Sequence, residues 1–540
     1  MTENLNLAQL AQQLSPQALA QSAANAGKNK AEYEKLKQAF YSAQVNLNKF
    51  APSPIDLRSF AWQLEGKDRN WWWQLQALPF LNWYVSSYQL QSAEEQQSFL
   101  QFCLSAFECW CLNAEHNANS PLNWHDHATA FRLRNLVNWF THCVYNQLDN
   151  GFASDKRLQP FTALLNKHLC WLAEDTNYSE HTNHGFDQAL VMYTVALYLP
   201  NAGMEQFLQL GKSRLIAELK HAFTDEGVHK ENSPGYQKFM LGRVKTLVNL
   251  DSLGDIEVSS LAKDYVEKAE AFLKALTLPN GELPLIGDTQ AGDRGILDRN
   301  DGVSLEIFDY SGSGYVVIKG LTNENKAYYF LLKNSHQSNY HRHDDDLMLY
   351  LWFDGEVILG DGGLYSHNEK CELRKFFRSH LAHNVPFINE KAVRDRAKLS
   401  AHPELCIDNT ISLIKATSHM FGVKITREVD YSNIQDGILK VMDNAEYLNL
   451  STNHFIGPDF KPVQLDVNKF RFESDRNYCS IEYEEALGLQ VVSGVNQKSE
   501  HISIYSNRYN EKISTFRVSF SHERGANAVI DFGALGCKDE

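Results

Sequence analysis

The 540-residue sequence lacks a long apolar run: no stretch of about 18 apolar residues occurs, so no membrane-spanning helix is expected. Its N-terminus has neither the basic start nor the continuous apolar segment of a secretory signal. We therefore expect no membrane contact and a cytoplasmic protein, or a periplasmic or secreted one if a signal has been removed. Low-complexity tracts and internal repeats are lacking too, which indicates a folded chain of two or three domains.

Basic charge and paired cysteines are also scarce. The chain carries 51 Lys and Arg against 66 Asp and Glu, a net charge of −15. This balance argues against a general nucleic-acid binder, which needs a basic surface, although one basic groove for an anionic substrate can coexist with it. The nine cysteines include no CxxC pair, which favours buried free thiols over disulfides.

The hydrophobic period divides the chain. Up to about residue 305 apolar residues recur at helical spacing, as in "FDQALVMYTVALYLPN" and "LAKDYVEKAEAFLKALTLPNG". From about Tyr310 the period is two, as in "KAYYFLLKN" and "STFRVSFSH". The pattern predicts a multidomain α+β protein with a helical extension over 1–50, a helical bundle or toroid over 51–305 and an antiparallel β-sandwich over 306–540.

Two short motifs in the helical half concentrate polar groups. Asn183 and His184 stand before an amphipathic helix in "NHGFDQAL", where Asn183 is either a functional amide or simply the N-cap. Tyr236 follows the turn "SPG", as a functional phenol or as ordinary half-buried packing.

The densest polar motif is "HRHDDD", which precedes an apolar run with the hairpin turn Asp354-Gly355. Alternation along a strand would aim His341 and His343 to one side, about 7 Å apart. Together with Asp361 and His383, His343 offers two imidazoles and a carboxylate, a ligand set that suits zinc. The alternative is that these residues only satisfy turns.

The stretch "NWHDHATAFRLRNLVNWF" combines aromatic and basic residues at helical spacing. Trp124 could stack on a sugar, while His127, Arg132 and Arg134 could read a carboxylate or sulfate. The alternative is a buried helix whose arginines lie on the outside.

Five motifs occur in an order that resembles the heparinase II/III-like polysaccharide lyases and related alginate lyases, over roughly residues 120 to 400. They are "SPGYQ", "PLIGDTQ", "SGYVVIKG", "HRHDDDLMLYLWFDGEVILGDGGLYS" and "FFRSHLAHNV". The resemblance implies an (α/α) toroid followed by an antiparallel β-sandwich. It also implies β-elimination of a uronic-acid polymer such as heparin, heparan, chondroitin or hyaluronan, without an organic cofactor.

The resemblance further implies roles for individual residues. Asn183 and His184 would neutralise the substrate carboxylate, Tyr236 would act as the acid, and as base too where both groups lie on one face, and His341 would be the base for the opposite epimer. His343, Asp361 and His383 would hold zinc in a structural role.

Positive charge beside Tyr236 is expected, because a phenol with its usual pKa is a poor base at neutral pH. Arg342, Arg378 and Lys230 are the residues we expect to supply it, and the two arginines are also expected to contact substrate. Gln188 stands where some relatives have an acid, so the polymer itself stays open.

Two other functions stay open on the sequence. A glycoside hydrolase on the same helical scaffold could use Asp187, Glu231 and Asp288, although none sits where its pKa is obviously raised. A non-catalytic carbohydrate-binding or capsule-assembly protein is the third possibility. The oligomeric state is not predicted.

Overall fold

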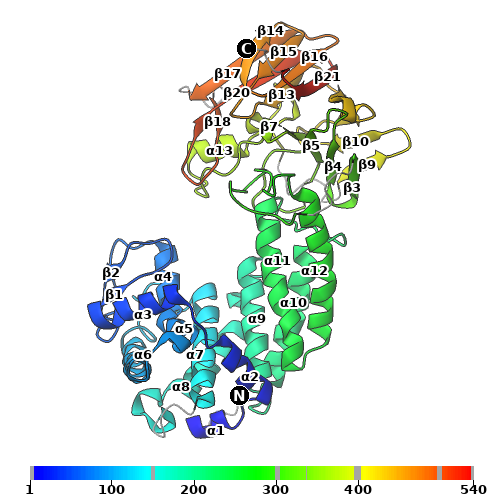
Figure 1. The fold of residues 1–540 in the computed structure, drawn as a ribbon. Helices are drawn as coiled ribbons and strands as arrows, with labels where there is room; N and C mark the ends of the chain where they lie inside the picture. The colour runs from blue at the N-terminus through cyan, green and yellow to red at the C-terminus, as the bar shows by residue number, and fades with distance from the viewer. Residues whose placement is uncertain are drawn as a thin grey trace. The chain divides into compact units, whose positions relative to one another are not determined.

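The computed structural model describes residues 5–146, 152–297, 304–335, 337–394, 403–495 and 502–536. Helices make up most of the chain as far as Leu276, and antiparallel strands make up most of it from Leu305 onward (Figure 1). The predicted order of a helical half followed by a β half is therefore confirmed. Closure of the helices into a toroid stays a prediction.

The helices of the first half follow one another with short joints. They are α1 (Leu7–Ala11), α2 (Pro16–Asn25), α3 (Lys30–Ser42), α4 (Arg69–Gln76), α5 (Pro79–Ser86), α6 (Ala93–Asn113), α7 (Asp126–Tyr145), α8 (Phe161–Ala173), α9 (Asn183–Tyr198), α10 (Glu205–Ala222), α11 (Pro234–Val248) and α12 (Glu257–Leu276). The two-residue strands β1 (Gln44–Val45) and β2 (Ser53–Pro54) pair between α3 and α4. Local signals match these bounds: Ser92 and Glu95 form a capping box on α6, and prolines occupy the first turns of α2 and α5.

The chain forms two compact units, and the boundary between them does not coincide with the change from helices to strands. Unit 1 comprises residues 1–222 and 246–262, and unit 2 comprises residues 223–245 and 263–540. The helices α11 and α12 thus contribute to both units. Unit 1 has its own core, rich in Trp, Phe and Leu from α3 to α9.

The described residues of unit 2 form three sheets, and the strand pairs in these sheets are antiparallel. The first sheet has the order β3 (Leu305–Tyr310), β4 (Tyr315–Leu321), β5 (Ala327–Lys333), β6 (Met348–Phe353) and β7 (Glu356–Leu359). The second has the order β14 (Lys461–Leu465), β15 (Lys469–Glu473), β16 (Asn477–Tyr483), β21 (Gly525–Ala534), β12 (Ile438–Ala445), β11 (Ile425–Asp430), β10 (Leu413–Ser418) and β9 (Glu404–Asp408). The third has the order β19 (Ile513–Ser514), β18 (Ile502–Tyr505), β17 (Gly488–Val495), β20 (Phe516–His522), β13 (Leu450–Phe455) and β8 (Pro386–Ile388). A short helix, α13 (Glu372–Arg378), lies between β7 and β8 in sequence.

The burial of strand β6 explains its pattern of apolar residues. Its odd residues Leu349, Leu351 and Phe353 join a core shared with the other sheets, whereas Met348 and Trp352 join a second core with Val228 and with residues of 272–286. Both faces of this sheet are therefore buried, which explains an apolar run with no polar face.

The hairpin turn after β6 also follows the prediction. Phe353 pairs with Glu356, so the turn holds only Asp354 and Gly355, with φ of +42° and +96°. Two positive φ values are the geometry that an Asp-Gly pair tolerates in a two-residue hairpin.

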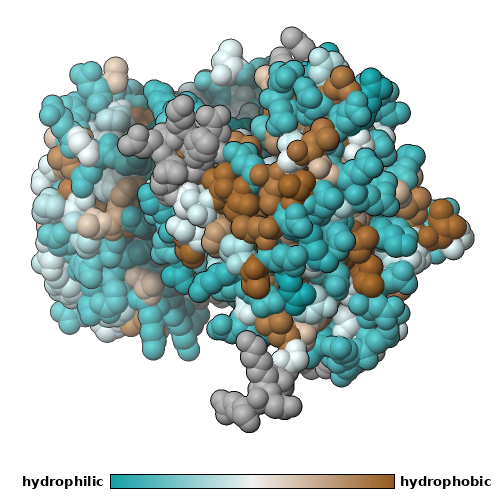
Figure 2. Space-filling model, turned by 90° about the horizontal axis from the view of Figure 1, so that it is seen from above, coloured by the Kyte–Doolittle hydropathy of each residue, from teal (hydrophilic) through white to brown (hydrophobic). Residues whose placement is uncertain are grey.

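The surface of unit 2 exposes apolar side chains around its edge strand β14. Val463 and Leu465 on that strand and the nearby Val467 and Leu487 are exposed, and Figure 2 shows apolar residues gathered on the face seen from above, among hydrophilic ones. Scattered exposed apolar residues are normal, and none of the predicted site residues is among these four. Among the described helices, none combines the length and apolarity that a membrane span requires.

Candidate active site

Tyr236 and His341 meet in unit 2 although about a hundred residues separate them in sequence. Tyr236 lies in the first turn of α11, and His341 lies in the loop before β6 with a φ of +50°. Their rings stack with centroids 3.7 Å apart and an interplanar angle of 22°. The side-chain amide of Asn232 joins the two segments, because its Nδ2 donates to the carbonyls of Ser338 (3.0 Å) and Tyr340 (3.2 Å).

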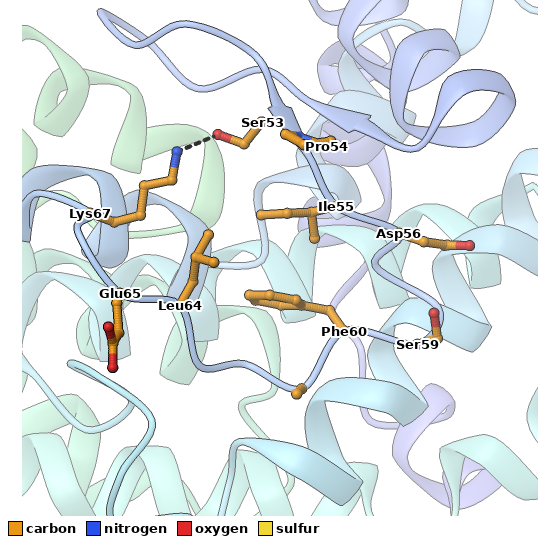
Figure 3. A pocket seen from close by; sticks show the side chains of 10 residues that line it. Ser53, Pro54, Ile55, Asp56, Ser59, Phe60, Leu64, Glu65 and Lys67 are labelled. Atoms are coloured by element: carbon orange, nitrogen blue, oxygen red, sulfur yellow. Dashed lines mark hydrogen bonds between the residues drawn. The ribbon is translucent and has the colours of Figure 1, made fainter.

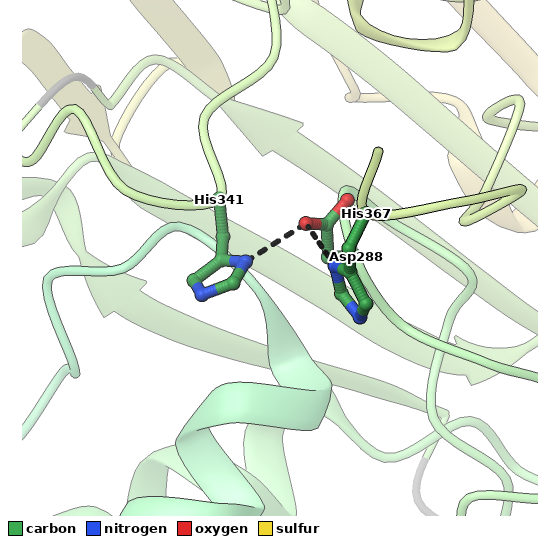
Figure 4. A group of neighbouring side chains, drawn as sticks. All are labelled: Asp288, His341 and His367. Atoms are coloured by element: carbon green, nitrogen blue, oxygen red, sulfur yellow. Dashed lines mark hydrogen bonds and ion pairs between the residues drawn. The ribbon is translucent and has the colours of Figure 1, made fainter. Parts of the chain in front are cut away.

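A buried carboxylate, Asp288, fixes the orientation of His341. Nδ1 of His341 lies 2.8 Å from Oδ2 of Asp288, and the exposed His367 approaches the same oxygen at 3.8 Å (Figure 4). Nε2 of His343 lies 3.0 Å from Oδ1, and Arg374 donates to both oxygens at 2.5 and 2.9 Å. Because a carboxylate can only accept, Nδ1 of His341 carries a proton, while Nε2 lies 3.5 Å from Oε2 of Glu231.

Asp288 stays ionised in this setting. Burial raises its pKa, but the hydrogen bonds from His341, His343 and Arg374 outweigh burial and hold the pKa well below the usual range. The preceding residue, Gly287, allows the backbone turn that positions Asp288. Gly287 has a φ of +56°, and a Cβ there would lie 3.1 Å from the carbonyl oxygen of Asn232.

Tyr236 has its pKa raised, not lowered, which corrects the expectation from the sequence. Burial is the main cause, the carboxylates of Asp288 and Glu231 add to it, and only Arg374 opposes it. The main contributors to this pKa do not include Lys230, Arg342 or Arg378, the three residues expected to lower it. The phenol is therefore neutral and able to donate a proton.

The strand expected over "HRH" is absent from the described loop, since β6 begins only at Met348. His341 and His343 are instead brought together by the two oxygens of one carboxylate. The aspartates that follow serve buried cations: Asp345 accepts from Lys333 at 2.6 Å, and Asp346 accepts from Arg342 at 3.1 Å.

The predicted metal ligands do come together. His343, Asp361 and His383 are buried, and one ligand atom from each lies within 4.8 Å of the others. Nδ1 of His383 donates to Asp361 (3.0 Å), and Nε2 is a buried atom with no hydrogen-bond partner among the described residues. Burial lowers the pKa of His383, but the carboxylates of Asp361 and Asp345 outweigh burial and raise it.

In unit 1, His184 belongs to a cluster around Asp126. Nδ1 of His184 lies 2.7 Å from Oδ2 of Asp126, Nδ1 of His125 lies 2.6 Å from Oδ1, and the rings of His127 and His184 stack at 3.5 Å. Burial raises the pKa of Asp126, but the hydrogen bonds from His125 and His184 outweigh burial and hold the pKa far below the usual range. The carboxylate thus orients two imidazoles at the starts of α7 and α9.

Asn183 is the first residue of α9, and the N-cap is Thr182, whose side chain accepts from the N–H of Gly185. The N-cap interpretation of Asn183 is therefore wrong by one residue. Its side-chain amide makes no hydrogen bond to the described residues. Gln188 is buried and holds the preceding loop, since Oε1 accepts from the N–H of Ser179 (2.9 Å) and Nε2 donates to the carbonyl of Asn177 (2.8 Å).

The groove predicted on α7 stays a prediction, and its residues differ in burial. Arg132 is fully buried and donates to the carbonyls of Gln76 (2.8 Å) and Asn123 (2.6 Å), so a substrate contact for it is wrong. Half-buried Trp124 donates to the carbonyl of Glu115 (3.0 Å). Arg134 is exposed.

The two arginines expected to contact substrate in unit 2 differ. Arg342 is 2% exposed and paired with Asp346, so it does not face a ligand. Arg378 is one-third exposed, donates to the Arg342 carbonyl (2.8 Å) and pairs with Glu369.

A separate pocket of about 440 Å³ lies among residues 53–67 of unit 1 (Figure 3). The charged residues that line it are Asp56, Glu65 and Lys67, and Lys67 donates to Ser53 (2.8 Å). A net acidic lining does not favour an anionic polymer, and none of the predicted site residues is among the ten that line this pocket.

Sequence reasoning missed the residues that organise both clusters. Asp126 stands between two histidines in "HDH", and Asp288 stands in "PLIGDTQ", so each had a local signal. Arg374 had none, because nothing local marks a helical arginine as the partner of a carboxylate 86 residues away.

Comparison with known proteins gives matches over most of the chain. The family description "Heparinase II/III N-terminus" matches residues 3–312, and "Heparinase II/III-like, C-terminal" matches residues 303–520. None of the curated proteins matches this chain.

Solved structures of two lyases share the fold. The heparan sulfate lyase HepC from Pedobacter heparinus is 16% identical with a TM-score of 0.71, over 98% of this chain and 88% of that chain. A structure described as "Heparinase III-BT4657 gene product, Methylated Lysines" is 15% identical with a TM-score of 0.71, over 94% and 85%. At such identities the likeness concerns the fold alone.

Proposed function

Because this chain belongs to the heparinase II/III family and is a polysaccharide lyase, we propose that it cleaves a uronic-acid-containing polymer by β-elimination. The observation that carries the proposal is the stacked pair of Tyr236 and His341, with the imidazole oriented by Asp288. Elimination requires an acid and a base, and a neutral phenol can supply the first and the neutral form of an imidazole the second.

The reaction removes the proton on C5, next to the uronate carboxylate, and breaks the bond between C4 and its oxygen. Nε2 of His341 takes the C5 proton, and the electron pair left behind forms the C4=C5 double bond as the C4–O bond breaks. The phenol of Tyr236 gives its proton to the departing oxygen, so one product ends in a hydroxyl and the other in an unsaturated uronate. No water is consumed.

The surrounding charges suit these two transfers. The Asp288 carboxylate stabilises the imidazolium that forms when His341 takes the proton. Because burial and two carboxylates raise the pKa of Tyr236, the phenolate left after donation regains a proton readily. The same raised pKa keeps Tyr236 in its phenol form, which cannot accept the C5 proton, so we assign the role of base to His341 for every substrate.

Loss of a proton next to a carboxylate builds negative charge that donors must offset. We assign this role to Asn183, whose amide makes no hydrogen bond to the described residues, and to His184, whose Nδ1 is held by Asp126. The orientation leaves Nε2 of His184 for substrate.

The cluster of His343, Asp361 and His383 fits zinc. Two imidazoles and a carboxylate are ligands that zinc accepts, and the buried lone pair on Nε2 of His383 is a donor without another use. When bound, the ion would tie three segments of unit 2 together and would supply stability rather than chemistry. Through His343 these segments also hold Asp288.

Hydrolysis by paired carboxylates is less well supported. A general acid needs a raised pKa, whereas the pKa of Asp288 is well below the usual range and both of its oxygens are bound by Arg374. Asp187, another carboxylate considered for hydrolysis, is buried and has a histidine as its neighbour, since it lies 3.2 Å from Nε2 of His127.

The test is incubation with heparin, heparan sulfate, chondroitin sulfate, hyaluronan and alginate while ultraviolet absorbance and reducing ends are measured together. We expect both to rise on at least one polymer, because the C4=C5 bond conjugates with the carboxylate. Reducing ends without absorbance would indicate hydrolysis, and binding without either would indicate a non-catalytic protein.

A further inference from the structure

A strip of basic and aromatic side chains beside the Asp126 cluster is not explained by the roles above. It lies on one face of α4, since Arg69 and Trp73 are four residues apart. Their neighbours Trp71 and Trp72 are buried in the core, whereas Arg69 is exposed and Trp73 is half-buried. The helix therefore presents one cation and one large ring outside the core.

Contacts connect Arg69 to His184 through a chain of oriented groups. Nη2 of Arg69 lies 2.7 Å from Nε2 of His125, and because a guanidinium only donates, that nitrogen accepts. Nδ1 of His125 lies 2.6 Å from Oδ1 of Asp126, and the other oxygen of Asp126 accepts from Nδ1 of His184. Arg69 has five donors in a planar fork, and exposure leaves others of them for a ligand.

Trp73 lies close to the same group of imidazoles. Its ring centroid is 5.5 Å from that of His127, which stacks on His184 at 3.5 Å. It is also 5.8 Å from Phe131, over which the Arg134 guanidinium lies at 4.4 Å from the ring centroid. A continuous strip thus runs from Arg69 past His184 to Arg134.

The strip has the chemistry of an acidic-sugar site. A half-buried indole offers an apolar face to the C–H groups of a sugar ring, and guanidinium forks match carboxylate and sulfate oxygens. The starts of α7 and α9, helices of 20 and 16 residues, also meet here through Asp126 and His184, which adds positive potential. In a chain of net charge −15 such a local cluster is selective for an anion.

We infer that Arg69, Trp73 and His125 form a subsite that binds a carboxylate- or sulfate-bearing sugar residue of the polymer, adjacent to the one that His184 contacts. The inference rests on the proposed function for the identity of the polymer. Arg69 and Trp73 hold the sugar directly, and His125 acts by fixing the guanidinium.

Affinity electrophoresis of the full chain in gels cast with heparin, chondroitin sulfate or alginate tests this subsite. Arg69→Ala and Trp73→Ala should each weaken retardation about fivefold to tenfold, the effect of losing one charge-assisted or stacking contact. Arg69→Lys should keep part of the affinity, and Trp73→Phe should keep most of it. Added salt should reduce the effect of Arg69→Ala more than that of Trp73→Ala, because salt screens exposed charge.

The matched control is Arg524→Ala, which removes an exposed guanidinium from the turn between β20 and β21. Retardation of the Arg69 and Trp73 variants equal to that of Arg524→Ala would overturn the inference, as would a wild-type chain that none of the three polymers retards. The conservative variants separate loss of contact from loss of folding. If the wild-type chain binds polymer through this strip but produces no rise in absorbance, the proposed elimination is contradicted and the subsite is still supported.

Discussion

Asp126 and Asp288 are the centres of two clusters that share a design, one in each unit. Each carboxylate accepts hydrogen bonds from two histidines, and each has its pKa depressed by them in spite of burial. They differ in what else surrounds them. Asp288 is also neutralised by Arg374 and holds an imidazole against a phenol, whereas Asp126 holds its imidazoles beside an exposed arginine and a half-buried indole.

The difference shows how a carboxylate that holds two histidines can serve two tasks. A buried carboxylate with its charge compensated can orient a base next to a proton donor, because little water competes there. A carboxylate near the surface orients imidazoles that remain accessible, as the one-third exposed side chain of His184 shows. We therefore expect mainly losses of turnover around Asp288, and losses of binding and stability in addition to turnover around Asp126, which holds His184.

The largest effect is expected from Tyr236→Phe. The change deletes the proton donor and leaves the stacked ring, so turnover should fall about 10²–10⁴-fold while polymer binding persists. Initial rates of absorbance increase on a polymer that the wild type cuts are the measurement. Tyr340→Phe, which removes an exposed phenol from the neighbouring loop, is the control and should retain wild-type turnover. A loss below about tenfold in Tyr236→Phe would be inconsistent with its role as the acid.

Asp288→Asn sharpens the comparison further. An amide cannot accept from His341, His343 and Arg374 together, so His341 should lose its orientation, and kcat should fall about 10²-fold or more with a small change in KM. Steady-state kinetics and circular dichroism on the same preparations check this.

The control for Asp288→Asn is Asp475→Asn, an exposed change of the same chemistry. A rise in KM at unchanged kcat would assign Asp288 to binding and would remove the contrast with Asp126.

The buried metal cluster gives the next effect. Protein purified without added metal should contain about one zinc per chain by elemental analysis. His383→Ala should abolish this content and lower the free energy of unfolding by about 3 kcal/mol, because it leaves the carboxylate of Asp361 buried without its partner. His419→Ala, a change at a half-exposed histidine in the same unit, is the control. If no metal is found and His383→Ala has the stability of the wild type, the cluster only packs polar side chains and holds no metal.

The sequence predicted the fold well because helix and strand periods are local. Leu349 and Leu351 share a face, and Asp354-Gly355 turns, for reasons visible within ten residues. The site was harder to predict, because its geometry depends on long-range contacts. His341 and His343 were identified by type, but they lie in a loop and are joined by Asp288. The expected positive charge near Tyr236 proved to be two carboxylates and one arginine.

The smallest effect, and the most specific one, is expected from Asp126→Asn. The pKa of Asp126 is depressed in the fold, so its ionised form contributes stability above the unfolded value near 4 and loses it as pH falls toward the folded value. Asp126→Asn should therefore cost about 1–2 kcal/mol at pH 7, the effect of weakened hydrogen bonds from His125 and His184, and less at pH 3. Urea unfolding of both proteins at pH 3, 5 and 7 measures the difference. A deficit that is as large at pH 3 as at pH 7 would mean that the side chain's shape, not its charge, holds the two histidines, and the parallel with Asp288 would fail.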